Sequence, residues 1–228
     1  MIVSELVTEI RNRSGDANIT ETSVTGWTNT ATRLVSTRTD WPFLLMTDDT
    51  DTTTSGTVEY TLPTDFRKMF SFRVGSSTST EPEADEYSFI GYMEKNKAVN
   101  SISDSIAGYY INPTNSKYGI VPEPTTTGDK VYQKYYKHPT TVSAVSATPE
   151  LPTTYHDIYL DFGLARYWEQ EDELDKTVLY ETKVENGIEA MKTEFVKSIG
   201  QLSRMRDVRE LNTLNHPQGL NSVMTGRQ

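Results

Sequence analysis

The stretch VEYTLPTDFRKMFSFRV, residues 58–74, decides the fold class of this chain. Apolar residues alternate with polar ones on both sides of Pro63-Thr64-Asp65, and this period of two is typical of half-buried strands. We therefore expect two strands joined by a short turn. Turns rich in proline, glycine and asparagine separate further expected strands at 109–111, 118–121 and 131–137.

The segment 57–145 is thus predicted to form a small antiparallel sheet, either a sandwich or a partial barrel. Residues 47–56, which are almost all polar, are expected to be a loop before it. Residues 87–97 fit either a short helix or a strand with a turn.

Helices precede this region. Apolar residues recur every four positions from Ile2 to Ile10 and give a first helix one apolar face, which ends at Ser14-Gly15-Asp16. A second helix is expected to begin near 20–22, where Thr and Glu side chains can cap it. The sequence Asp40-Trp41-Pro42-Phe43 ends it, because the residue before a proline disfavours the helical conformation.

Helices also follow the strands. One is expected from about residue 155, with an apolar stripe of Tyr155, Ile158, Phe162, Ala165 and Trp168. The last helix is the longest, and its apolar face is marked by Leu174, Val178, Val184, Ile188, Met191, Phe195, Ile199 and Leu202. Its periodicity weakens from about Arg206, and residues 212–228, which contain proline, glycine and asparagine, are expected to be extended or disordered.

Together these elements predict an α+β fold. Residues 1–56 and 146–205 are expected to form a helical bundle, because each helix has only one apolar stripe and must bury it against another. The β domain at 57–145 is an insertion in this bundle. Residues 206–228 form an extended C-terminal arm.

Charge is distributed unevenly along the chain. The 228 residues carry a net charge of −10, but residues 196–228 hold five basic and two acidic residues, so this end is +3 and residues 1–195 are −13. A general nucleic-acid-binding protein usually has the opposite sign. An acidic body with a basic end suggests that the two parts meet different surroundings.

Signals for disulfides, export and membranes are absent from the sequence. There is no cysteine, which fits assembly in a reducing cytosol. The start MIVSELVTEIRNR lacks the basic region and apolar stretch of a signal peptide. No run of about 18 apolar residues occurs, so we expect no membrane span.

Signatures of catalysis are absent too. The sequence contains no GxxxxGK[ST], GxGxxG, HExxH or GxSxG. His156, beside Asp157 at a predicted helix start, is expected on the surface or at the helix N-terminus. A general base is the alternative, but no nucleophile or second histidine lies at a suitable spacing. We therefore predict no enzymatic activity, no catalytic residue, no metal site and no cofactor.

Three clusters of charged or aromatic residues could serve a chemical function, but a purely structural role is expected for each. Asp48, Asp49 and Asp51, with Glu59 at the twelfth position, resemble a calcium loop, but Thr53 replaces the central glycine, so a solvated loop is expected. Solvation rather than acid catalysis is also expected for Glu169, Glu171, Asp172, Glu173 and Asp175. The third cluster is Tyr132, Tyr135 and Tyr136 with Lys134 and Lys137. These side chains could stack on nucleic-acid bases, but we expect a strand that is partly covered on both faces.

Several short marks occur in a characteristic order along residues 1–205. They are Asp40-Trp41-Pro42-Phe43 after the helical start, Leu62-Pro63-Thr64-Asp65-Phe66 at a strand end, Pro122-Glu123-Pro124 before Tyr135-Tyr136-Lys137-His138-Pro139, and Leu151-Pro152 before Tyr155-His156-Asp157. In their order and spacing they resemble the head–tail adaptor family of tailed bacteriophages, also called head–tail connectors.

This resemblance implies a structural virion protein at the neck between head and tail. Such adaptors form a ring, a dodecamer in well-described cases, that docks under the portal protein, continues the DNA channel and offers a platform to tail or nozzle proteins. Genomic DNA would pass an acidic lining without specific binding. The basic end would reach the portal, and the candidate portal contacts are Arg204, Arg206, Arg209, Leu211, Leu214 and Leu220.

Two other classes of protein remain as alternatives. One is a different phage neck or tail component, such as a gatekeeper, tail-tube or tail-terminator subunit. These are mostly β, so the helical fraction discriminates them. The other is a receptor-binding module that uses the tyrosines of the inserted sheet, for which binding to host glycans would be the test.

Overall fold

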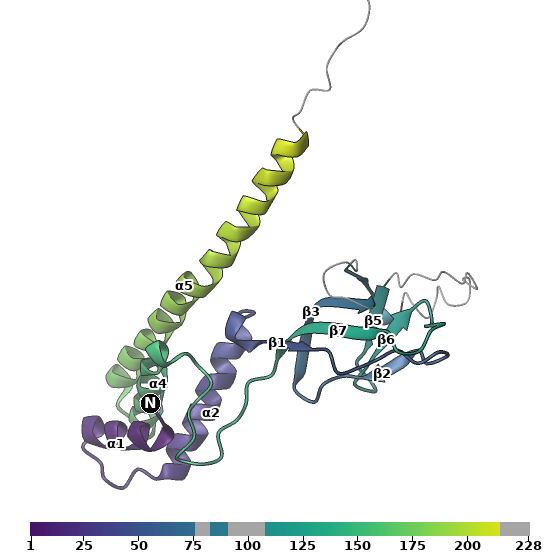
Figure 1. Ribbon diagram of the computed structural model, residues 1–228. Coiled ribbons are helices and arrows are strands. Elements are labelled where there is room, and N and C mark those ends of the chain that lie inside the picture. Colours follow the sequence, from purple (N-terminus) through teal and green to yellow (C-terminus); the bar gives the residue numbers. More distant parts are fainter. Residues whose placement is uncertain (76–82, 91–107, 215–228) are drawn as a thin grey trace, which may run out of the picture.

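The computed structural model describes residues 1–75, 83–90 and 108–214, with side chains as far as Phe195. It has an α+β fold in which the sheets lie to one side of a helical bundle (Figure 1). The helices are α1 (Val3–Ser14), α2 (Glu21–Arg38), η1 (Pro42–Leu44), η2 (Thr153–Tyr155), α4 (Asp157–Gln170) and α5 (Leu174–Leu214). The strands are β1 (Leu45–Asp48), β2 (Glu59–Thr61), β3 (Phe66–Gly75), β4 (Asp85–Tyr87), β5 (Gly108–Asn112), β6 (Lys117–Val121) and β7 (Lys130–Lys137).

The first two helices begin and end at the signals that the sequence provides. Gly15, with a φ of 77°, terminates α1, and its N–H donates to the carbonyl of Arg11. The side chain of Thr20 caps α2 by accepting a hydrogen bond from the N–H of Ser23. Both predicted helices are confirmed.

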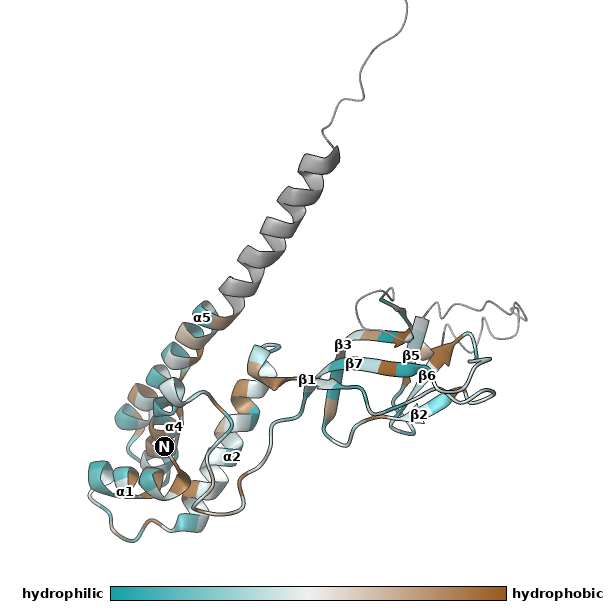
Figure 2. Ribbon diagram, in the orientation of Figure 1, coloured by the Kyte–Doolittle hydropathy of each residue, from teal (hydrophilic) through white to brown (hydrophobic). Residues whose placement is uncertain are grey.

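The bundle core forms around α4, which contacts α1, α2 and α5. This helix is buried on more sides than the single stripe predicted from the sequence, since Tyr159, Leu160 and Leu164 are buried as well as Ile158 and Phe162. Hydrophobic and hydrophilic residues alternate along the helices that surround it (Figure 2).

Two predictions for α5 were wrong. Leu174 and Val178, expected on its buried face, are 72% and 61% exposed. The buried stripe of α5 instead passes through Thr177 and then Val184. Leu174 and Val178, in the first turns of the helix, therefore lie outside this stripe and are exposed. The chain was also predicted to be extended from residue 206, whereas α5 continues to Leu214. Residues 215–228 lie outside the described part.

The inserted strands form two sheets over one core. One sheet has the order β1-β7-β3, and the other has the order β2-β6-β5-β4. All strand pairs are antiparallel except β4–β5, which is parallel. Side chains from both sheets fill the space between them: Leu62, Met69, Phe72, Tyr109, Tyr118, Ile120, Val131 and Tyr135. This arrangement is a small sandwich.

The sandwich corrects some strand assignments. The strands on either side of Pro63-Thr64-Asp65 do not form a hairpin, because β2 pairs with β6 whereas β3 pairs with β7. Part of the predicted polar loop at 47–56 belongs to β1, which pairs with β7. Of the ambiguous segment 87–97, Tyr87 ends β4, and 91–97 lies outside the described residues.

Trp41 is a large, fully buried side chain at the end of the bundle that leads into β1. Its indole Nε1–H donates to the carbonyl of Val35 at 2.7 Å, and its ring stacks on Phe43 at 5.8 Å. We predict that Trp41→Ala lowers the free energy of unfolding by about 3–5 kcal/mol, because it leaves a cavity and an unpaired buried carbonyl. Urea denaturation followed by circular dichroism would measure this loss.

Trp27→Ala provides a matched control, because Trp27 only packs partly buried against the same core. It is expected to cost clearly less. Equal losses for the two variants would contradict the role given to Trp41.

Candidate interaction surfaces

The chain crosses from the bundle to the sheets beside Asp40. This carboxylate accepts a hydrogen bond from Arg67 Nη2 at 2.6 Å and one from Lys68 Nζ at 2.7 Å. Arg67 also donates to the carbonyl of Ser36 at 2.5 Å and lies over the ring of Tyr136 at 5.8 Å. The first residues of β3 are thereby tied to the C-terminal end of α2.

The returning chain is fixed by a second ion pair. Lys137 Nζ lies 2.7 Å from Glu150 Oε1, and the two side chains are only 15% and 18% exposed. Burial alone would raise the pKa of Glu150, but the hydrogen bond and charge of Lys137, together with the N–H of Thr140, hold that pKa below its usual value. The pair therefore closes the segment between β7 and η2 into a fixed loop.

His156 is the N-cap residue of α4, as predicted, but it is only 3% exposed, so a position on the surface is excluded. Its Nε2 is 2.8 Å from the carbonyl oxygen of Leu151, to which it donates. The Leu151 N–H donates to the hydroxyl of Tyr159, which in turn lies 3.0 Å from Thr32 Oγ1. This buried network joins α2, the Leu151-Pro152 corner and the start of α4.

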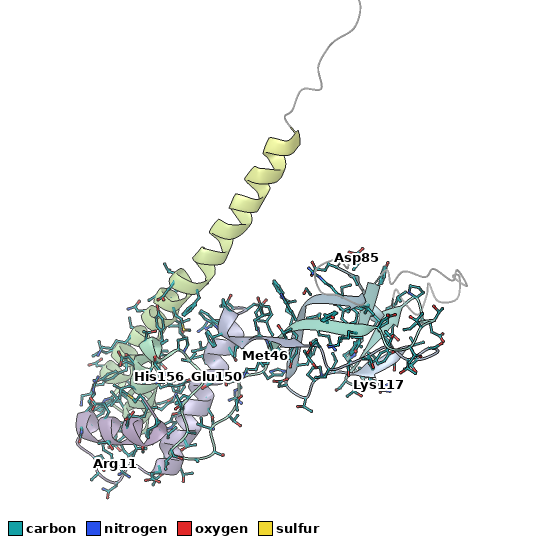
Figure 3. All side chains as sticks on the ribbon, viewed as in Figure 1. Arg11, Met46, Asp85, Lys117, Glu150 and His156 are labelled. Atoms are coloured by element: carbon teal, nitrogen blue, oxygen red, sulfur yellow. The ribbon has the colours of Figure 1, made fainter. Side chains whose placement is uncertain are left out.

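Several of the short sequence marks take part in these contacts. Figure 3 marks Glu150 and His156 in the bundle and Met46 on the strand that leads away from it. Asp65, another residue of these marks, accepts a hydrogen bond from the hydroxyl of Tyr135 at 2.9 Å, and burial with this contact raises the pKa of Tyr135 to about 12. Asp40 and Lys137 thus lie where the sandwich meets the bundle, whereas Pro122-Glu123-Pro124 lies between β6 and β7, where the carbonyl of Pro124 accepts from the N–H of Gly56.

The tyrosines of β7 are largely committed to packing. Tyr135 and Tyr136 are 5% and 8% exposed, and Tyr132 is half-buried. Lys137 is engaged by Glu150, whereas Lys134 is exposed. The predicted strand with both faces covered is therefore confirmed for the two buried tyrosines, and base stacking by their rings is ruled out by burial.

The helix α5 projects far beyond the bundle (Figure 1). Its 41 residues span about 60 Å at the rise of an α-helix. Phe195 is the last described side chain in contact with the body, through the rings of Phe43 and Tyr155. The candidate portal contacts from Arg204 to Leu214 lie on its last described turns, and Leu220 lies outside the described residues.

A scan against protein-family models finds a match to the SU10 adaptor protein over residues 1–212. The chain belongs to the SU10 adaptor protein family. This is a family of structural phage proteins of the head–tail adaptor type, and it is not a family of enzymes. Its members associate with portal and tail components at the virion neck. A search of curated proteins found no match.

The candidate calcium loop has structural partners in this adaptor. Asp51 accepts hydrogen bonds from the hydroxyl of Tyr118 at 2.8 Å and from Gln133 at 3.4 Å, inside the sandwich. Glu59 accepts from Asn112 at 3.0 Å. In the part of the chain that the structure describes, no group of three or more His, Cys, Asp or Glu residues is placed to hold a metal ion.

A pocket of about 210 Å³ between α2 and the segment after β7 is lined by Asn29, Thr30, Thr32, Arg33, His138, Pro139, Thr140 and Thr141. Ligand pockets are commonly about 300–1,000 Å³. Within the described ranges, none of the helices has both the length and the apolar character required to cross a membrane.

The buried imidazole predicts a pH dependence of stability. Burial lowers the pKa of His156 below its ordinary value of 6.5, so the folded state favours the neutral ring. The unfolded chain takes up the proton first as the pH falls. This contribution to stability is therefore present above about pH 6.5 and is lost progressively below it.

We predict that the melting temperature falls less between about pH 7.5 and about pH 5.5 in His156→Gln than in the original chain, since glutamine does not titrate but retains an N–H donor for Leu151. Differential scanning calorimetry across this range measures the difference. His138→Gln is the control, because His138 is exposed. Parallel pH profiles for His156→Gln and the original chain would contradict the prediction.

Proposed function

We propose that this adaptor forms a closed ring between portal and tail and continues the DNA channel. The projecting α5 is the observation that carries this proposal. This helix projects beyond Phe195, the last described side chain that contacts the body, and a projecting helix suits contact with a neighbouring protein. The membership in a head–tail adaptor family makes the portal the fitting partner.

The charge distribution supports the same arrangement. The body of −13 repels phosphate groups, and phosphate attraction is the main source of nonspecific DNA affinity. DNA can therefore slide through a ring of such bodies without sticking. The +3 end suits an acidic groove on the portal, and we assign this contact to Arg204, Arg206, Arg209, Leu211, Leu214 and Leu220.

Ring closure makes a weak single contact sufficient. Burying one leucine stabilises a complex by roughly 1.5–3 kcal/mol, but ordering a chain end costs part of this gain. Repetition around a ring multiplies the contact through avidity. The subunit is therefore proposed to remain monomeric until a portal ring serves as the template.

The first test is the solution mass of the purified chain, alone and with portal protein from the same phage. Analytical ultracentrifugation is expected to show monomers alone and a defined portal–adaptor ring in the mixture. Stable closed rings in the absence of portal would overturn the templated assembly. A mixture in which both components sediment separately would overturn the adaptor ring itself.

The portal contact is tested by deleting residues 206–228. Portal binding is expected to be lost while the melting temperature stays within a few degrees, because the body contacts described for α5 end at Phe195. A full-length variant with Arg204→Gln, Arg206→Gln and Arg209→Gln separates charge from length. It should bind more weakly and with less dependence on salt.

The matched control neutralises three bases elsewhere, with Lys117→Gln, Lys183→Gln and Lys192→Gln. It changes the net charge by the same amount and should retain binding. Undiminished portal binding by the truncated chain would remove the C-terminal segment from the contact.

A further inference from the structure

One face of the β1-β7-β3 sheet carries basic and apolar side chains together. The strand register places Lys134 opposite Thr47 and Ser71, and Arg73 opposite Tyr132. Cross-strand partners share a face of the sheet. We call this side the basic face and define it by Thr47, Lys68, Phe70, Arg73, Tyr132 and Lys134.

The basic face is chemically unlike the rest of the body. It holds three basic residues and no acidic one, in a segment 1–195 that carries −13. Asp40 at its edge binds Lys68 and Arg67. Phe70 is 56% exposed, although its ring meets that of Tyr136 at 5.9 Å. Aromatic and arginine side chains are enriched in protein–protein contacts, and charged residues are common at the rim of such contacts.

A complementary surface lies at the turn between α4 and α5. We call residues 169–179 the acidic corner, because they contain five acidic residues and one lysine. This corner also exposes apolar side chains, with Leu174 at 72%, Val178 at 61% and Leu179 at 52% exposure. It therefore combines negative charge with apolar area, as the basic face combines positive charge with apolar area.

The basic face and the acidic corner lie far apart in the folded subunit. The start of α4 and Phe195 of α5 are near Phe43, at the end of the bundle that leads into β1. The antiparallel α4–α5 pair places the acidic corner at the other end, away from the sheets (Figure 1). One chain cannot bring the two surfaces together, whereas neighbouring copies can.

We propose that the basic face of one copy docks on the acidic corner of the next copy. This inference rests on the proposed ring, of which it names the subunit contact. Two different surfaces of the same chain make a head-to-tail contact, and such a contact closes into a ring when its rotation allows. Phe70 packs against the leucine and valine side chains of the corner, and Lys134 and Arg73 meet its carboxylates.

Nucleic acid fits the basic face less well than a second copy does. The rings of Tyr135 and Tyr136 are buried and cannot stack on bases, and part of the positive charge is neutralised by Asp40. Lys134, which is exposed, stands on an acidic body that repels phosphate. The exposed apolar residues of the corner match Phe70 and have no counterpart on a DNA backbone.

The absence of cysteine permits a direct test by cross-linking. Single-cysteine variants Thr47→Cys, on the basic face, and Val178→Cys, on the acidic corner, are mixed and assembled on portal protein, then treated with a short thiol cross-linker. The mixture is expected to give cross-linked dimers, and each variant alone is expected to give none. Thr193→Cys, exposed on α5 beyond the corner, replaces Val178→Cys as the control pair.

The outcomes separate this inference from the proposed function. Portal-bound rings without Thr47–Val178 cross-links would overturn the contact and leave the ring intact. Cross-links within either single variant alone would indicate a contact of like surfaces and also overturn it. Failure to form any portal-bound assembly with the original chain would count against the proposed function itself.

Charge reversal provides a second, independent measurement. Lys134→Glu is expected to weaken ring assembly roughly tenfold, because like charges then face each other. Glu171→Lys with Asp175→Lys should weaken it similarly, and the combined variant should recover most of the loss. Lys117→Glu, a reversal on the other sheet, is the control for net charge.

Binding to DNA is measured in parallel by fluorescence polarisation with a labelled duplex. No binding is expected from the original chain at physiological salt. Binding that is abolished by Lys134→Glu and unaffected by changes in the acidic corner would assign the basic face to nucleic acid and overturn the proposal.

Discussion

Two charged contacts tie the inserted sandwich to the helical bundle. The chain leaves the bundle beside Asp40, which binds Arg67 and Lys68 of β3, and returns at Lys137, which binds Glu150. The side chains of Arg67, Lys137 and Glu150 are 18%, 15% and 18% exposed, so solvent screens these pairs less than it screens surface ion pairs. Trp41, fully buried next to Asp40 in the sequence, donates to the carbonyl of Val35 and stacks on Phe43, and so stabilises the end of the bundle to which the sandwich is tied.

This tie between sandwich and bundle matters for the proposed assembly, because the surfaces of one copy must then meet several neighbours at once. The projecting α5 is proposed to reach the portal, while the basic face and the acidic corner are proposed to meet adjacent copies. Each of these contacts is small and weak alone. A ring makes them cooperative, since a copy held at one contact has its other surfaces already placed for the next. A loose junction would lose this advantage, because each contact would then have to order the domains again.

Local apolar periodicity predicted most of the helices and strands. It failed where contacts between distant parts of the sequence determine strand pairing or burial. Alternation found β3, β5, β6 and β7, but it could not show that β2 pairs with β6 rather than with β3. β1 was missed because Thr47 and Asp48 are polar, and its strand conformation comes from pairing with β7. The helix start at His156 was predicted correctly, but its burial was not, because the Leu151 carbonyl that it contacts lies outside the helix. The family marks were recognised in their order, but the contacts that they make are visible only in the fold. The portal contacts remain a prediction from charge and position.

The most direct test of the proposed ring is electron cryomicroscopy of the adaptor bound to its portal. We expect one closed ring of adaptor subunits on the portal, with α5 directed into the portal and the basic face of each copy against the acidic corner of the next. Rings in which the sandwiches contact the portal and α5 points toward the tail would contradict it, as would adaptor subunits bound singly without contacts to one another.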